Sequence, residues 1–280
     1  MRKMVWIRFS EHADRAYELL RPLGFKANES TWIQEVNMPF DDERRRMLTE
    51  GLARRGIAYT EMEYQVFEEG ELRTADYLHV TGKAMWGYPQ PEDGYERESY
   101  DVSTACPKCL QGARQVRPFM VKNRPNFGKN DVVTMFWTYD FLFNERIKDL
   151  VKDSSLTGAE FWPVFKYRKT GLREEVRGAY QLFITSELPP MAADMKFEMV
   201  PLPKGVKPCS CGKLGRNLRG TQARYRSKDL RHAMDFNKTY EWLGGGYGTT
   251  QWKVVSHRVY DLFTENKIKG VKFEPVIIEE

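Results

Sequence analysis

Four cysteines are the residues of this chain whose type and spacing most clearly suggest chemistry. They form two close pairs that are widely separated in the sequence: Cys106, Cys109, Cys209 and Cys211. Tetrahedral Zn²⁺ takes four soft ligands, and each short pair can bend its backbone around one edge of the ion. We therefore predict a structural zinc site with four thiolate ligands.

Two other states of these cysteines are open. Nothing in the chain indicates secretion, and bonding Cys209 to Cys211 would strain the backbone, so a disulfide is the weaker interpretation. Buried free thiols are the second alternative. The second pair is C-x-C instead of C-x-x-C, and Leu110 stands where a zinc knuckle often has glycine. These departures concern the metal geometry.

The histidines and carboxylates give little sign of catalysis. The chain has four histidines, none near another in sequence, and no pair of carboxylates is marked by its spacing. A catalytic zinc normally keeps one position open, whereas four cysteines would fill all of them. We therefore expect a protein that is not an enzyme.

The composition predicts a globular α+β protein. Hydrophobic residues make up 41% and aromatic residues 13% of the 280 residues, which is enough for a sizeable core. No apolar run approaches the ~20 residues that span a bilayer, and the apolar run at the N-terminus stops at Arg8. We expect a cytoplasmic protein with reduced cysteines and no membrane partner.

The distribution of charge predicts two domains. Residues 1–100 carry 14 Lys/Arg and 19 Asp/Glu, a net charge of −5, and the remainder carries 30 and 20, a net charge of +10. We predict a small α/β sandwich over residues 1–95, with the order strand–helix–strand–helix–strand–strand and its last strand at 77–80. The cysteine domain would cover residues 96–280.

An internal repeat organises the second domain. Residues 142–164 and 254–276 align without gaps at an offset of 112. Each copy predicts a strand, a polar helix cap (Asn144 or Ser256), a short helix, a glycine and a strand that ends in Pro-Val. Because one cysteine pair precedes each copy, zinc would staple two related halves together. The identical positions are Arg146/Arg258, Asp149/Asp261, Leu150/Leu262, Gly158/Gly270, Phe161/Phe273, Pro163/Pro275 and Val164/Val276.

Residues 204–231 are the most basic segment, with nine Lys/Arg and Asp229 as the only acid. Such a block could contact phosphates, form a solvated face or match an acidic partner. Only Tyr225 is interleaved with the cations, which is not the stacking pattern of single-strand binders. The candidate partner or nucleic-acid contacts are Lys213, Arg216, Arg219, Arg224 and Arg226.

Several of these segments together resemble one family. The Cys-Pro-Lys-Cys pair after Tyr-Asp-Val-Ser, the Cys-Ser-Cys-Gly pair, the Trp-Leu-Gly-Gly-Gly loop and the ending Gly-Val-Lys-Phe-Glu-Pro-Val resemble bacterial double-CxxCG proteins. The similarity covers about residues 98–280. Many members are regarded as immunity proteins that neutralise a toxin. The resemblance therefore implies a non-enzymatic binder with structural zinc and a cognate protein toxin as its partner.

Two hypotheses of different classes follow. In the first, the chain binds and blocks a toxin, and its acidic N-terminal domain covers a basic site on that toxin. In the second, it is a zinc-dependent nucleic-acid-binding or regulatory protein that uses residues 204–231. Salt-dependent nucleic-acid binding that is lost on neutralising the arginines would favour the second hypothesis. An uncharacterised enzyme is a third and weaker alternative.

Overall fold

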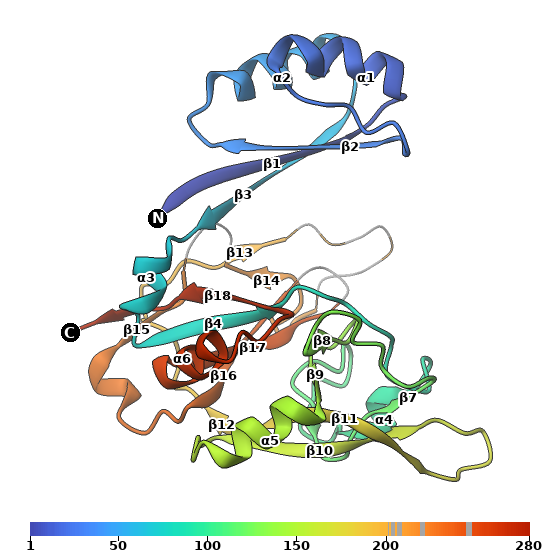
Figure 1. The fold of residues 1–280 in the computed structure, drawn as a ribbon, viewed down its shortest axis with the longest axis vertical. Coiled ribbons are helices and arrows are strands. Elements are labelled where there is room, and N and C mark those ends of the chain that lie inside the picture. The colour runs from blue at the N-terminus through green and yellow to red at the C-terminus, as the bar shows by residue number, and fades with distance from the viewer. Residues whose placement is uncertain (201, 203–204, 206–208, 219–221, 245–247) are drawn as a thin grey trace. The chain divides into compact units, whose positions relative to one another are not determined.

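The chain folds into two compact units, Met1–Glu71 and Leu72–Glu280, in this computed structural model. The structure describes all residues except 201, 203–204, 206–208, 219–221 and 245–247 (Figure 1). Lys204, Lys207 and Arg219 of the basic segment, and Gly245 and Gly246 of the glycine-rich loop, lie outside the described residues.

The first unit is a three-stranded antiparallel sheet, in the order β2-β1-β3, packed on two helices. Alternation along β1 buries Val5, Ile7 and Phe9 against the helix residues Leu48 and Leu52, as a sheet with one covered face requires. The predicted small α/β sandwich is therefore present. Its elements are β1 (Arg2–Ser10), α1 (Ala13–Leu20), η1 (Arg21–Leu23), β2 (Ile33–Pro39), α2 (Glu43–Arg54) and β3 (Tyr59–Val66), followed by α3 (Glu69–Arg73) at the boundary.

The strand predicted at 77–80 does not belong to this sandwich. It forms β4 (Tyr77–Gly82) and lies between β17 (Thr250–Ser256) and β18 (Val271–Pro275), where Figure 1 shows one cyan arrow among red ones. It is hydrogen-bonded to both neighbours in antiparallel register. Leu78 and Val80 are buried there, so a core distant in sequence decides the pairing of this strand.

Two five-stranded sheets make up most of the second unit, in the orders β7-β10-β11-β9-β8 and β12-β16-β17-β4-β18. The remaining strands form short pairs, β5 with β6, β13 with β14 and β15 with β19. The further elements are α4 (Tyr95–Ser99), β5 (Tyr100–Asp101), β6 (Arg114–Gln115), β7 (Met120–Val121), β8 (Val132–Thr134), β9 (Phe141–Asn144), α5 (Glu145–Asp153), β10 (Ala159–Lys166), β11 (Glu174–Ile184), β12 (Ser186–Glu187), β13 (Glu198–Met199), β14 (Arg216–Asn217), β15 (Arg224–Arg226), η2 (Ser227–Leu230), β16 (Phe236–Leu243), α6 (His257–Glu265) and β19 (Ile277–Glu279).

The sequence repeat corresponds to two strand–helix–strand units, β9–α5–β10 and β17–α6–β18. In each strand–helix–strand unit the two strands flank a third, antiparallel strand. This strand is β11 in the first copy and β4 in the second. The inserted strand follows the first copy in sequence but precedes the second. The two halves therefore share one topology with different connections.

Corresponding residues of the two copies adopt corresponding backbone conformations. After each helix, Ser155 (φ 56°) and Lys267 (φ 52°) are left-handed, and Gly158 (φ 88°) and Gly270 (φ 108°) turn the chain into the next strand. The copies differ at the proline. Pro275 ends β18 as predicted, whereas β10 continues past Pro163 through a register shift to Lys166. A bulge accommodates the missing N–H donor within β10.

Each half also contributes a short segment that pairs with an edge of the other half's sheet. After β11 leaves the centre of the first sheet, Ser186 and Glu187 pair with β16 at the edge of the second. After β4 leaves the second sheet, Met85 bridges to Thr134 of β8 in the first. One hydrophobic core joins residues of both sheets with α5 and α6. The halves are thus interlocked by chain exchange as well as by the cysteines.

Candidate metal centre and the junction of the two halves

The four cysteines meet in one cluster, as predicted from their spacing. Their sulfur atoms all lie within 4.8 Å of one another, and each residue is half-buried. Cys106 Sγ lies 3.4 Å from Cys209 Sγ, and Cys109 Sγ lies 3.5 Å from Cys211 Sγ. A bonded pair would be at about 2.05 Å, so no disulfide joins these cysteines. Both close contacts join one pair to the other, across the two halves.

The spacing of the sulfurs fits a tetrahedral ion. Four ligands at a metal–sulfur distance of about 2.3 Å stand roughly 3.8 Å apart, close to the observed separations. Burial raises the pKa of Cys109 to about 12, whereas backbone N–H groups of Cys109 and Lys108 lower the pKa of Cys106 to about 6 and so favour its thiolate form. Metal ligation requires that form. The cluster can therefore hold a metal ion with four sulfur ligands.

Leu110 adopts the conformation that its position demands. Its φ is 56°, in the left-handed region that favours glycine, and its N–H donates to Cys106 O at 2.8 Å. In the second pair the residue after the last cysteine is Gly212, with φ 69°. Leu110 therefore forms the turn that glycine would form at this position, at the cost of backbone strain.

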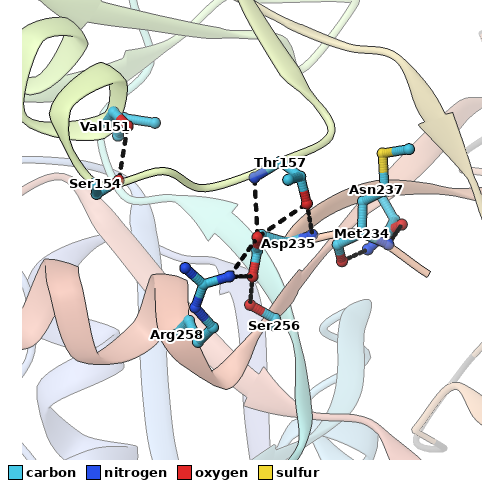
Figure 2. Close-up of polar contacts among 8 residues, drawn as sticks. All are labelled: Val151, Ser154, Thr157, Met234, Asp235, Asn237, Ser256 and Arg258. Carbon is cyan, nitrogen blue, oxygen red and sulfur yellow. Dashed lines mark hydrogen bonds and ion pairs between the residues drawn. The ribbon is translucent and has the colours of Figure 1, made fainter. Parts of the chain in front are cut away.

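Asp235 is the centre of a second, polar junction between the halves (Figure 2). Its carboxylate accepts hydrogen bonds from Thr157 N and Thr157 Oγ1, both at 2.9 Å, and from Ser256 Oγ at 2.7 Å. Arg258 Nη1 lies 3.0 Å from Asp235 Oδ2. Ser256 and Arg258 belong to the second copy of the repeat, and Thr157 belongs to the first. One buried carboxylate thus links the two copies.

Asp131 makes corresponding contacts, but with the roles of the two copies reversed. It accepts from Asn144 Nδ2 at 3.2 Å and lies 3.0 Å from Arg146 Nη2, both in the first copy. Lys269 N, in the second copy, donates to its other oxygen at 3.0 Å. Asn144 and Arg146 align with Ser256 and Arg258 in the repeat. The junction is therefore reciprocal.

Hydrogen bonding keeps both carboxylates charged. Burial raises the pKa of Asp131, but the N–H of Lys269 and the side chains of Arg146 and Asn144 outweigh burial and lower it. Burial acts likewise on Asp235, and Ser256, Thr157 and Arg258 lower its pKa. Sequence comparison missed this pair because the two aspartates are not separated by the repeat's offset of 112. An alignment that allowed a gap before each strand could have found them.

The described cations of the basic segment mostly have partners within the chain. Arg216 stacks on Phe197, with its guanidinium carbon 3.6 Å from the ring centre. Arg224 forms ion pairs with Asp194 at 2.7 Å and Glu279 at 3.1 Å. Lys213 Nζ lies 5.8 Å from the ring centre of Trp242. Arg226, by contrast, is exposed on β15. Of the described contact residues, Arg216 and Arg224 are thus already engaged within the chain.

The comparisons with known proteins add no relative. The chain matches no protein-family model. A search of curated proteins found no match either. Among the described residues, every helix is too short or too polar to traverse a lipid bilayer.

Proposed function

We propose that this chain is a bacterial, cytoplasmic protein of the immunity type, which binds and neutralises a cognate toxin without catalysing a reaction. We further propose that its four cysteines hold one structural Zn²⁺. The cluster of four sulfurs is the observation that carries the proposal. Four protein ligands leave no open position for a substrate or an activated water, which is the pattern of structural zinc.

The place of the cluster supports a scaffolding role for the metal. One cysteine pair precedes each strand–helix–strand unit, and the closest sulfur contacts join one pair to the other. A metal there would hold two halves together that the aspartate junctions also connect. The resemblance to double-CxxCG proteins then supplies the toxin as the partner, and it covers this same unit.

Charge matching by the first unit gives the proposal less support than the sequence suggested. Residues 1–71 carry 11 Lys/Arg and 14 Asp/Glu, a net charge of −3. Several of these acids already form ion pairs, such as Glu61 with Arg45 and Glu63 with Lys3 at 2.6 Å. Exposed pairs of this kind leave a weak net field around the unit.

Protection of living cells tests the proposal. A candidate toxin gene, sought next to the gene for this chain, would be expressed in a bacterial host, with and without the chain. We expect survival only when the chain is present, and a purified complex of the two proteins. Cys109→Ser should abolish protection, whereas the exposed neighbour Ser210→Ala serves as the matched control.

Two results would count against the proposal. Cells that die equally with and without the chain would contradict the immunity role. Salt-dependent binding of the purified chain to DNA or RNA, lost on Arg226→Gln, would favour the nucleic-acid hypothesis instead.

A further inference from the structure

A cavity of about 680 Å³ lies in the second unit, next to the cysteine cluster. Cys109 and Leu110 form part of its wall, so the turn between the cysteines shapes it. Other parts of the wall come from α4, the loop 136–140, the end of β11, and β16 with β17. Cavities of this size hold small organic ligands. The proposed toxin binding does not account for it.

Two lysines line one part of this cavity. Lys238 of β16 and Lys253 of β17 are direct partners across the two strands, so both side chains lie on one face of the sheet. Lys253 Nζ forms an ion pair with Asp140 at 3.2 Å. No such pair forms between Lys238 and any carboxylate that the structure describes.

The environment of Lys238 disfavours its charge. Burial is the main effect that lowers the pKa of Lys238; Glu187, its direct partner on β12, and Asp140 counter it, and Arg114 and Lys253 add to it. A desolvated ammonium that forms no direct ion pair is costly, and an anion placed beside it would offset that cost. This part of the cavity therefore favours a negatively charged group.

Aromatic rings form another part of the cavity wall. Trp137 stacks on Tyr95, with ring centres 5.8 Å apart, and contacts Tyr88 at 4.5 Å. The backbone of Trp137 (φ 71°) and Tyr139 (φ 56°) is left-handed, which side chains of this size rarely adopt. Trp137 is 47% exposed, so the strain does not serve to bury the ring. Strain held at an exposed aromatic residue is typical of binding sites.

We propose that this cavity binds a planar organic anion, whose carboxylate pairs with Lys238 and whose apolar body lies against Trp137. A cationic ligand is the competing class, because Glu92 and Glu96 also line the cavity. Glu92 is exposed to solvent, so its charge is already hydrated. Lys238 gains more from a counterion because its charge is desolvated.

Three probes of one shape test this proposal on the full chain. Indole-3-acetate, indole-3-acetamide and tryptamine carry a negative, a neutral and a positive group on the same ring. We expect isothermal titration calorimetry to show saturable binding of indole-3-acetate, at least tenfold tighter than that of the amide. Equal or tighter binding of the amide or of tryptamine would overturn the proposal, and so would the absence of binding by all three at millimolar concentration.

Variants of Lys238 test the assignment of the charge. Lys238→Met should remove the preference for the anion, Lys238→Arg should keep it, and the exposed Lys152→Met should leave it unchanged. Because Lys238→Met removes a half-buried charge that forms no ion pair among the described residues, we expect its Tm to equal or exceed that of the parent chain. A folded Lys238→Met chain that still prefers the anion tenfold would refute the role of Lys238. The toxin is absent from these measurements, so they are independent of the proposed function.

Discussion

Asp131 and Asp235 hold the two halves of the second unit together by the same contacts made in opposite directions. Asp131 accepts a hydrogen bond from the backbone N–H of Lys269, and Asp235 accepts one from that of Thr157. Each donor directly precedes the shared glycine position of the repeat, Gly270 or Gly158. Each carboxylate is also bound by the arginine of its own copy, Arg146 or Arg258. This reciprocity means that the loss of either carboxylate should have a similar effect.

We predict that Asp131→Asn and Asp235→Asn each lower the free energy of unfolding by about 1–3 kcal/mol. The amide preserves the shape but loses the charge-assisted hydrogen bonds. Urea denaturation followed by circular dichroism measures the change. Asp153→Asn, at an exposed position on α5, is the control and should stay within about 0.5 kcal/mol. Unequal losses would contradict the reciprocal roles of the two aspartates.

The stability that these aspartates contribute should depend on pH. Their pKa values are lowered in the folded chain, so their contribution is complete above the unfolded value of about 4 and is lost as pH falls through the folded values. We expect the parent chain to lose more stability between pH 5 and pH 3 than the double variant Asp131→Asn/Asp235→Asn. Denaturation at both pH values tests this, and parallel losses would refute it.

Gly158 and Gly270 cannot be replaced by alanine at low cost. A Cβ on Gly158 would lie 2.2 Å from Phe236 O, and one on Gly270 would lie 2.1 Å from Val132 O, both backbone atoms. We expect either alanine variant to lose about 3 kcal/mol or more, or to yield no folded protein. Gly171→Ala has a similar φ of 79° with open space around it. It should cost only about 1–2 kcal/mol, so equal losses at all three sites would exclude the steric explanation.

Metal analysis should find one zinc ion for each chain purified without added zinc. We expect Cys109→Ser and Cys211→Ser to lose the metal, and a chelator to lower the Tm of the parent chain, because metal binding contributes to folding. Plasma mass spectrometry measures the content. Clearly substoichiometric metal in the parent chain would show that the cluster consists of free thiols.

Leu110→Gly should keep the metal and change stability little. Glycine relieves the left-handed strain of Leu110, worth about 1–2 kcal/mol, but loses about 0.5–1 kcal/mol through the entropy of the unfolded chain. We therefore expect a gain between zero and about 1 kcal/mol in denaturation. Leu110→Val, which is branched at Cβ and strained in this region, should be less stable than the parent chain. The opposite order would show that the turn opens in solution.

Local patterns in the sequence were enough for the α+β class, the strand–helix alternation of the first unit, the cluster of four cysteines and the repeat. Each of these depends on residues that are close in sequence, such as the alternation of β1 or the spacing of Cys106 and Cys109. The glycines expected after the repeat helices are also present, and both adopt positive φ.

Only the tertiary structure decided which strands and side chains meet. The place of β4 between β17 and β18, the opposition of Asp131 and Asp235, and the cavity beside Lys238 all join segments that are far apart in the chain. Such pairings depend on long-range burial and hydrogen bonding, to which local periodicity is blind. The sequence by itself thus determined the cysteine cluster and the repeated unit, and the packing of the two halves determined how they are joined.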